Sequence, residues 1–333
     1  GITLNINHPK GQEIARQLVS LCDVVIDKFT PRVMEKWGLD YKSLVRVRPD
    51  IIVINMPMQG LTGPRRDFLG FGAFIQALAG ISHLTGFPED DPVGTGTNYP
   101  DFSCNPYHAA FAILAALLYR KKSGKGQHID LSQYQSTASV LGSAILDYTV
   151  NGRIQQRMGN RHSSASPHGA YRCKGDDRWC VIAVFTDQEW ASFCRVIGTP
   201  PWAKEERFQT LLGRVKQADE LDWLVESWTV NYTPEEVMIM MQEAGVAAGV
   251  VRDIEDLMVR DPQMKARRHY VVLDHPETGS STYDSAPFKL SLTPGKLRSP
   301  APLIGQHNDD VYKQLLGFSE EKIAKLVEER VIY

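Results

Sequence analysis

Apolar residues in the first half of the chain form short continuous runs separated by amphipathic stretches. Residues 24–26 and 51–55 read VVI and IIVIN, and such runs are typical of parallel strands covered on both faces. Ile14, Leu18 and Leu21 recur at helical spacing and predict a helix. Further helices are predicted over residues 31–37, 70–81, 105–122 and 132–150, and a further strand over 128–131. This alternation predicts an α/β fold with a doubly wound sheet and right-handed crossovers.

The pattern changes after residue 150. Residues 151–169 are rich in Gly, Ser, Asn, Gln and Arg, which is typical of a linker or an active-site loop. Residues 171–185 predict a hairpin that turns at GDD, and the sequences TDQE and TPEE predict capping boxes at two helix starts. With short strands over 247–251 and 270–273, this region reads as a smaller α+β domain.

Composition narrows the class of protein. The chain has 333 residues, of which 43% are hydrophobic and 23% charged, and its net charge is −2. These values are typical of a soluble globular protein and give no electrostatic case for nucleic acid or an anionic membrane as a partner. No apolar run approaches the roughly 20 residues of a membrane span. The five cysteines lack the spacing of metal ligands, so we expect buried free thiols in a reducing cytoplasm and no metal site.

Asp101 is the strongest candidate for chemistry. It lies in the segment NYPDFSCNPY, residues 98–107, where Asn105 can cap a helix whose first residue is Pro106. A carboxylate just ahead of a helix N-terminus can remain ionised and act as a nucleophile. The alternative is an Asp that only terminates a loop. Cys104 is a weaker candidate, because no activating His and carboxylate pattern accompanies it.

Several motifs follow one another along the chain. They are ITLNINHPKG (2–11), DVVIDKFTP (23–31), WGLDY (37–41), RPDII (48–52), QGLTGP (59–64), AALLYRKKSGKGQ (115–127), IDLS (129–132) and APLIGQH (301–307). In this order they resemble the class III CoA-transferase family, which includes formyl-CoA and carnitine CoA-transferases. The resemblance covers essentially the whole chain.

The resemblance implies a domain organisation. We expect a Rossmann-like large CoA-binding domain over residues 1–150, a linker or active-site loop over 151–170, a small α+β domain over 171–299 and a segment over 300–333 that returns to the large domain. In the family two chains interlink, so we expect a homodimer; we expect the apolar residues of the return segment to need a partner surface. They are Leu315, Leu316, Phe318, Ile323 and Leu326. Family members carry further residues ahead of Ile2, so we also expect an N-terminally incomplete chain that begins inside a family strand.

The resemblance also implies an activity. Asp101 would attack an acyl-CoA thioester and pass CoA to a carboxylic acid, with CoA thioester as substrate and no permanently bound cofactor. The residues that align with the family's CoA contacts are Lys28, Phe29, Lys36 and Trp37. Gly60 and Gly63 permit close backbone approach to a substrate. Without the family pattern, these residues would be solvated lysines, core aromatics and a turn.

Three further features leave alternatives open. GNRH (159–162) and SPHG (166–169) align with a mobile loop of formyl-CoA transferase, although a plain interdomain linker is the equal alternative. The histidines in this stretch, His162 and His168, are acid–base candidates, but most loop histidines are only solvated. Arg65 and Arg66 would favour a dicarboxylate acid, or lie on the surface.

Two other functions compete with the transferase. α-Methylacyl-CoA racemases share the fold, and a His-Asp pair follows a Gly in the helix that corresponds to residues 70–80. Phe71 occupies the His position here and cannot transfer a proton, which favours a transferase. A non-catalytic subunit of a heteromeric transferase would fit the expected missing front segment, but it would not need Asp101.

Overall fold

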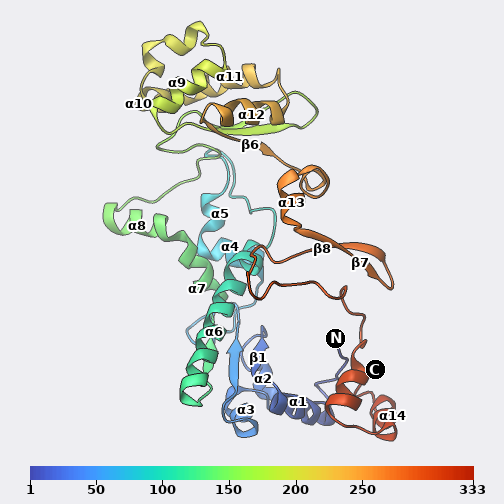
Figure 1. Cartoon of the computed structure of the whole chain (residues 1–333). Helices are drawn as coiled ribbons and strands as arrows, with labels where there is room; N and C mark the ends of the chain where they lie inside the picture. The colour runs from blue at the N-terminus through green and yellow to red at the C-terminus, as the bar shows by residue number, and fades with distance from the viewer. The chain divides into compact units, whose positions relative to one another are not determined.

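The computed structural model describes residues 1–333. The chain divides into two compact units, which we call the larger unit (residues 1–157 and 301–333) and the smaller unit (residues 158–300). Figure 1 shows the elements of both. No helix in the molecule combines the length and the apolar character that crossing a membrane requires.

The larger unit contains a parallel three-stranded sheet. Its strands β1 (Val24–Asp27), β2 (Ile52–Asn55) and β3 (His128–Asp130) lie in the order β1-β2-β3. All four residues of β2 are buried, as the continuous apolar run predicts. Asp27 pairs in register with Asn55, and Asn55 with Asp130. Three polar residues therefore stand side by side at the carboxyl edge of the sheet.

Helices account for most of the rest of the larger unit (Figure 1). They are α1 (Pro9–Leu21), α2 (Val33–Lys36), α3 (Tyr41–Val47), α4 (Gly72–Ala79), α5 (Ile81–Leu84), η1 (Pro100–Cys104), α6 (Asn105–Ser123), α7 (Gln133–Ala138), η2 (Ser139–Leu141), α8 (Gly142–Asn151), η6 (Asp310–Leu315) and α14 (Glu320–Glu328). Gly124 ends α6 in the left-handed conformation after three basic residues, as expected. The helix predicted over residues 132–150 is instead interrupted by the 3₁₀ turn η2.

The first residues of the chain do not form the expected strand. The Asn5 N–H donates to the Val331 carbonyl at 2.8 Å, and the Thr3 N–H donates to Asn308 Oδ1 at 3.0 Å. These backbone groups are therefore satisfied by the C-terminal segment rather than by a sheet. The prediction of a strand here was wrong because its pattern does not reveal partners 300 residues away.

The apolar face of the C-terminal segment is largely covered within its own chain. Phe318 and Leu326 are buried in a cluster with Ile14 of α1, and Leu316 and Ile323 pack against that cluster. The expectation that this face needs a partner surface was therefore wrong for these four residues. Leu315 alone among the predicted five remains 56% exposed.

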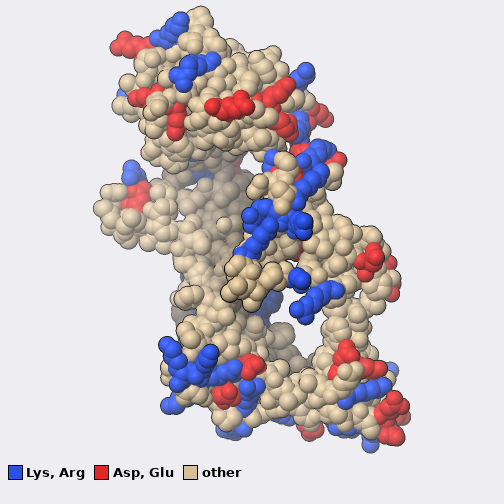
Figure 2. All heavy atoms as spheres, viewed as in Figure 1, with Lys and Arg blue, Asp and Glu red and all other residues tan.

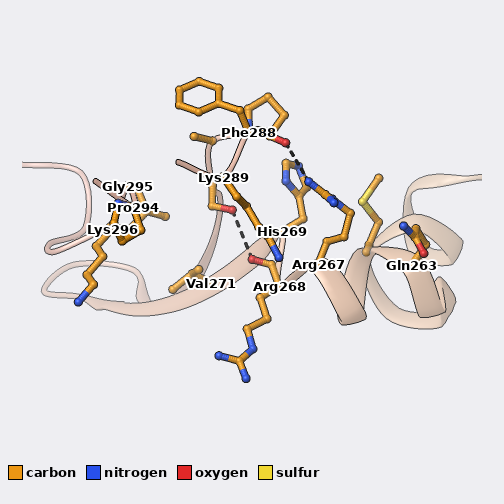
Figure 3. Close-up of a pocket in the computed structure, with 15 residues that line it drawn as sticks. Gln263, Arg267, Arg268, His269, Val271, Phe288, Lys289, Pro294, Gly295 and Lys296 are labelled. Atoms are coloured by element: carbon orange, nitrogen blue, oxygen red, sulfur yellow. Dashed lines mark hydrogen bonds between the residues drawn. The ribbon is translucent and has the colours of Figure 1, made fainter. Parts of the chain in front are cut away.

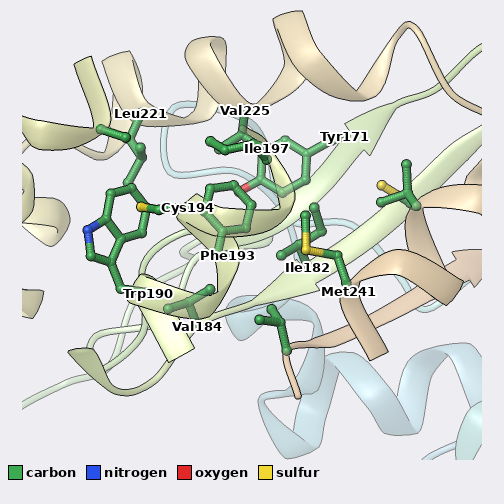
Figure 4. Close-up of a cluster of buried hydrophobic side chains, with 14 of the residues drawn as sticks. Tyr171, Ile182, Val184, Trp190, Phe193, Cys194, Ile197, Leu221, Val225 and Met241 are labelled. Carbon is green, nitrogen blue, oxygen red and sulfur yellow. The ribbon is translucent and has the colours of Figure 1, made fainter. Parts of the chain in front are cut away.

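The smaller unit is built on an antiparallel sheet of β4 (His168–Arg172), β5 (Trp179–Ala183) and β6 (Ala247–Val251). Its helices are α9 (Asp187–Val196), η3 (Pro201–Lys204), η4 (Glu206–Phe208), α10 (Leu211–Lys216), α11 (Ala218–Thr229), α12 (Pro234–Glu243), η5 (Asp256–Arg260) and α13 (Pro262–Arg267), and β7 (Tyr270–His275) pairs with β8 (Gly279–Asp284) in a hairpin. Both predicted capping boxes are present, at Thr186 and Thr233. One continuous apolar core joins β4 and β5 to α9, α11 and α12 (Figure 4).

Candidate functional site

Asp101 lies in the first turn of a continuous helical stretch. Pro100 opens the π-helical turn η1, and the Asn105 N–H donates to the Pro100 carbonyl where η1 runs into α6. The Asp101 N–H donates to the Asn98 carbonyl at 2.9 Å, and the side chain is half-buried. The carboxylate is therefore at the positive end of the helical dipoles.

Asn105 does not cap the helix as predicted. It is itself helical and 2% exposed, and no side chain caps α6 at Cys104. The Asn105 side chain instead donates to Gln133 Oε1 at 2.9 Å and accepts a hydrogen bond from the Ser136 hydroxyl. The sequence places these partners about 30 residues away, so the local pattern could not distinguish a cap from a buried network.

The same network reaches the sheet. Gln133 Nε2 donates to the carbonyl of Met56, the residue that follows β2, at 2.5 Å. Asn105 and Gln133 thus connect the start of α6 to the carboxyl end of a central parallel strand. Ligands of open α/β sheets bind at these carboxyl ends.

Gly72 opens α4 directly against the Asp101 carboxylate. A Cβ atom at Gly72 would lie 2.6 Å from Asp101 Oδ2 and 2.6 Å from the Asn98 Cβ. Since real contacts of this kind are longer, any side chain at position 72 would force the Asp101 carboxylate, Asn98 or both to shift. Sequence reasoning missed Gly72, although the closely spaced glycines at 70 and 72 were a usable signal.

The four predicted CoA contacts differ in their surroundings. The Phe29 and Trp37 rings meet edge to face, with centroids 5.4 Å apart. Trp37 also donates from Nε1 to Asn7 Oδ1 at 3.0 Å and packs against the buried cluster between α1, α3 and the sheet. Lys28 and Lys36 are exposed, and neither forms an ion pair. Phe29 and the two lysines are therefore available to a ligand, whereas Trp37 also has a structural role.

A pocket beside Phe29 lies at the carboxyl edge of the sheet. It holds about 160 Å³, and its lining includes Asp27, Asn55, Tyr41 and His128. Asn55 Nδ2 donates to the Asp27 carboxylate, and His128 Nε2 lies 2.5 Å from Asn55 Oδ1. The Tyr41 ring stacks on the His128 ring at 5.1 Å. Of the predicted residues only Phe29 lines this pocket.

Burial raises the pKa of Asp27, although hydrogen bonds from the Phe29 N–H and from Asn55 oppose the effect. The pocket thus places a carboxyl group of raised pKa beside an imidazole and two aromatic rings. Sequence reasoning missed this group. The signal was available in the polar residues that end two apolar runs, Asp27 and Asn55.

Gly60 and Gly63 form the turn that follows β2. Both have positive φ, of 89° and 94°. The Gly60 N–H faces the Pro57 carbonyl at 3.5 Å, and the Leu61 N–H donates to both Asp130 carboxylate oxygens at 3.0 and 3.1 Å. These bonds fix the turn to the end of β3. Gly63 is exposed, and a Cβ there would meet nothing within 4 Å.

The two histidine candidates lie in the smaller unit. Their ring centroids are 5.4 Å apart, and both rings approach Phe185. His168 Nδ1 lies 2.6 Å from the Asn160 carbonyl. The two histidines therefore lie where residues 160–168 contact β5 and Phe185, which follows that strand.

Four of the five cysteines are buried, including Cys104; Cys22 is exposed.

Comparison with known proteins gives consistent matches over nearly the whole chain. The model of CoA-transferase family III matches residues 1–308. Succinyl-CoA–D-citramalate CoA-transferase of Chloroflexus aurantiacus is 35% identical over 331 residues, 99% of this chain and 82% of that protein. The succinyl-CoA–L-malate CoA-transferase beta subunit of the same organism is 32% identical over 334 residues, again 99% and 82%. The crystal structure of a CAIB/BAIF family protein from Brucella suis has a similar fold, with a TM-score of 0.87 and 30% identity over 94% of this chain and 81% of that one.

Proposed function

Because the chain belongs to CoA-transferase family III and is therefore a CoA-transferase, we propose that Asp101 is the nucleophile that carries CoA between two carboxylic acids. The enzyme moves CoA from an acyl-CoA donor to a carboxylic acid acceptor. The observation that carries the proposal is the Asp101 carboxylate in the first turn of a helical stretch, one turn before Asn105, which is linked through Gln133 to the carboxyl end of β2.

The first half-reaction moves CoA onto the protein. The Asp101 carboxylate attacks the thioester carbonyl, the C–S bond breaks, and an acyl–aspartyl anhydride and CoA thiolate result. The thiolate then attacks the aspartyl carbonyl. This step releases the donor acid as its carboxylate and leaves CoA on Asp101 as a thioester.

The second half-reaction reverses these steps with the acceptor. Its carboxylate attacks the aspartyl thioester, releases CoA thiolate and forms a new anhydride. The thiolate attacks the acceptor's acyl carbon, which yields the new acyl-CoA and the free Asp101 carboxylate. Every step exchanges acyl groups between nucleophiles that the substrates or Asp101 supply, so the balance needs no oxidant or reductant.

We assign CoA binding to the carboxyl edge of the sheet in the larger unit. The exposed Phe29 ring offers an apolar face for the adenine, and Lys28 and Lys36 offer charge for the phosphates. Trp37 supports the Phe29 ring from the side. The turn at Gly60 and Gly63 supplies a backbone surface beside the substrate.

The acids are assigned from the relatives. Both named relatives use succinyl-CoA with a second acid, D-citramalate or L-malate. We therefore assign succinyl-CoA as donor and a dicarboxylic acid as acceptor. Arg65, which is exposed and forms no ion pair, is the candidate for the second carboxylate, whereas Arg66 lies 3.6 Å from Asp67. Phe71, at 60% exposure beside Phe74, supplies no acid or base for racemisation.

The assembly belongs to the same proposal. The large α/β domain would be doubly wound and Rossmann-like, residues 151–170 would form an active-site loop, and residues 300–333 would return to the large domain of an interlinked homodimer. Exposed apolar residues on α4, α6 and α8 support a large apolar interface. Buried cysteines support a reducing cytoplasmic setting. Since one relative is a beta subunit, a heteromer is the competing assembly.

Mass spectrometry tests the nucleophile directly. Protein incubated with succinyl-CoA should carry CoA on the peptide that contains Asp101. Asp101→Ala should carry none and should lose at least about 1,000-fold in turnover, because the covalent path is gone. Asp90→Ala removes an exposed carboxylate from the same unit and should retain both the CoA adduct and normal turnover.

A folded Asp101→Ala protein with normal turnover would refute the assignment. Deuterium exchange at the α-carbon of the bound acyl-CoA, without transfer, would favour a racemase.

A further inference from the structure

A strongly basic pocket lies in the smaller unit, between the end of α13 and the segment that follows the β7–β8 hairpin (Figure 3). It is an open hollow with a volume of about 730 Å³. Its lining contains no Asp or Glu. The basic residues that line it are Arg267, Arg268, His269, Lys289 and Lys296.

The four permanent cations of this pocket have no carboxylate partner. Arg267, Arg268, Lys289 and Lys296 form no ion pair. Arginines just before them in the chain behave differently: Arg252 pairs with Asp261, and Arg260 pairs with Glu255 and Asp256. Arg252 and Arg260 are thus neutralised by nearby carboxylates, whereas the four cations of the pocket are not. Figure 2 shows Lys and Arg atoms gathered over α13 and the adjoining end of the hairpin.

Hydrogen bonds hold the walls of the pocket together. Arg267 Nη2 donates to the Pro287 carbonyl at 3.3 Å, and the Ser285 hydroxyl donates to the Arg268 carbonyl at 3.3 Å (dashed lines in Figure 3). The Ser285 N–H donates to the His269 carbonyl at 2.7 Å. Arg268 has a positive φ of 52°. Its side chain points away from the Arg267 side chain (Figure 3). The cations are therefore presented by a connected scaffold.

The charge and the lining indicate the class of ligand. One dicarboxylate neutralises two of the four cations, whereas a polyphosphate chain or a doubly phosphorylated molecule carries three or four negative charges. Arginine and lysine both bind phosphoryl oxygens through charge-assisted hydrogen bonds. Phe288, Val271 and Leu297 add an apolar part to the lining, which suits an organic group attached to the phosphates.

We propose that this pocket binds a phosphate ester of metabolite size that bears several negative charges. The phosphates could belong to a CoA molecule or to a free nucleotide; the recognising chemistry is the same. With a free nucleotide as ligand the site goes beyond the transfer reaction, and with CoA it rests on the proposed function; none of its residues belongs to the group around Asp101 or Phe29.

Calorimetric titration of the full chain with sodium tripolyphosphate tests the pocket without reference to transferase activity. Lys289→Gln combined with Lys296→Gln should weaken binding by about tenfold or more, since two charge-assisted contacts are removed. Lys204→Gln combined with Lys216→Gln removes two exposed lysines from the same unit and should leave the affinity unchanged. The affinity of the Lys289→Gln/Lys296→Gln protein for tripolyphosphate should also depend less on the salt concentration.

Competition then identifies the source of the phosphates. Displacement of tripolyphosphate by CoA, but less by 3′-dephospho-CoA, would assign the site to CoA; displacement by ATP would assign it to a free nucleotide. Displacement by neither would overturn the assignment to a phosphate ester. Absence of saturable binding, or equal weakening in both double variants, would overturn the site itself. So would intact binding in the Lys289→Gln/Lys296→Gln protein together with a changed molar mass in light scattering, because the cations would then serve contact with another protein chain.

Discussion

The two units bury their apolar residues in different ways. The smaller unit has one continuous core of 16 buried residues, including Phe193, Phe208 and Leu221. The larger unit has three separate clusters of three to six buried residues. It also exposes large apolar residues along α6 and α8, among them Phe111 at 77% and Leu114 at 66%. The core of the smaller unit is thus one closed cluster, whereas α6 of the larger unit presents an apolar face that its own chain leaves exposed.

The continuous core and the candidate active site belong to different units. The candidate nucleophile, the pocket at the sheet edge and the CoA candidates all belong to the larger unit. Monomeric proteins rarely expose contiguous apolar faces of this kind, whereas interfaces do. We therefore expect substitutions on the open faces to change assembly, and substitutions in the closed core to change only folding.

The largest effect is expected when charged residues are placed on the exposed apolar face of α6. Phe111→Asp combined with Leu114→Asp should abolish the proposed homodimer. Burial of each side chain would contribute about 2 kcal/mol to the interface, and a two-fold interface contains each side chain twice. Light scattering over a dilution series measures the result, and far-ultraviolet circular dichroism reports whether the chain is folded. Trp223→Asp, at a site 69% exposed on α11 of the smaller unit, is the matched control and should remain dimeric. A monomer in the unsubstituted protein would contradict the proposal of an interlinked dimer.

The next test addresses the closed core through Arg214. This buried arginine donates to the Ser166 and Phe208 carbonyls at 2.8 and 3.1 Å and to Asp187 at 3.0 Å, and its guanidinium lies over the Trp190 ring. Arg214→Met should lower the free energy of unfolding of the smaller unit by about 3 kcal/mol, because two buried carbonyls lose their donor.

Tryptophan fluorescence in urea measures this change, since every tryptophan except Trp37 lies in the smaller unit. Arg195→Met removes an exposed arginine from α9 and should change the value by less than about 0.5 kcal/mol. Equal losses in both variants would show that the buried network contributes little.

Patterns that depend on neighbours in sequence were predictable, and contacts between distant segments were not. The run at residues 51–55 identified β2 because burial on both faces demands continuous apolar residues. Thr186 and Thr233 were recognisable because a capping box closes within one helical turn. Asn105 was misread as a cap because Asn before Pro fits a cap locally, while its partner Gln133 lies in another helix. The strand expected at the first residues was wrong, and the role of Gly72 was missed, because in both cases the partners lie far away in the sequence.

At the candidate site, the family resemblance predicted Asp101 and the residues near Phe29. The pocket beside Phe29 could be recognised only from the register of the strands. Only that register places Asp27 beside Asn55 and thereby forms the polar edge. Spacing in the sequence gives no distance between these two strands.

Gly72 lies beside the candidate nucleophile of the larger unit. Gly72→Ala should lower kcat/KM by about 100-fold, because the new methyl group must displace the Asp101 carboxylate or Asn98, and displacement of about 1 Å can cost that much. Gly142→Ala is the matched control: it also opens a helix of the larger unit, and a Cβ there meets nothing within 4 Å. Steady-state kinetics on both variants decide the matter. Unchanged kcat/KM for Gly72→Ala would mean that the carboxylate has room to move without loss.

The smallest expected effect concerns CoA affinity in the larger unit. Lys36→Ala should weaken CoA binding by about tenfold and change the rate of the bound reaction less, because a phosphate contact is remote from the acyl centre. Trp37→Ala should also weaken binding, but it removes the hydrogen bond to Asn7 as well and should lower thermal stability. Calorimetric titration with CoA compares both with Lys122→Ala, which removes an exposed lysine at the end of α6. If neither Lys36→Ala nor Trp37→Ala alters the affinity, Lys36 is a solvated surface lysine and Trp37 only a packing residue of the α1–α3 cluster.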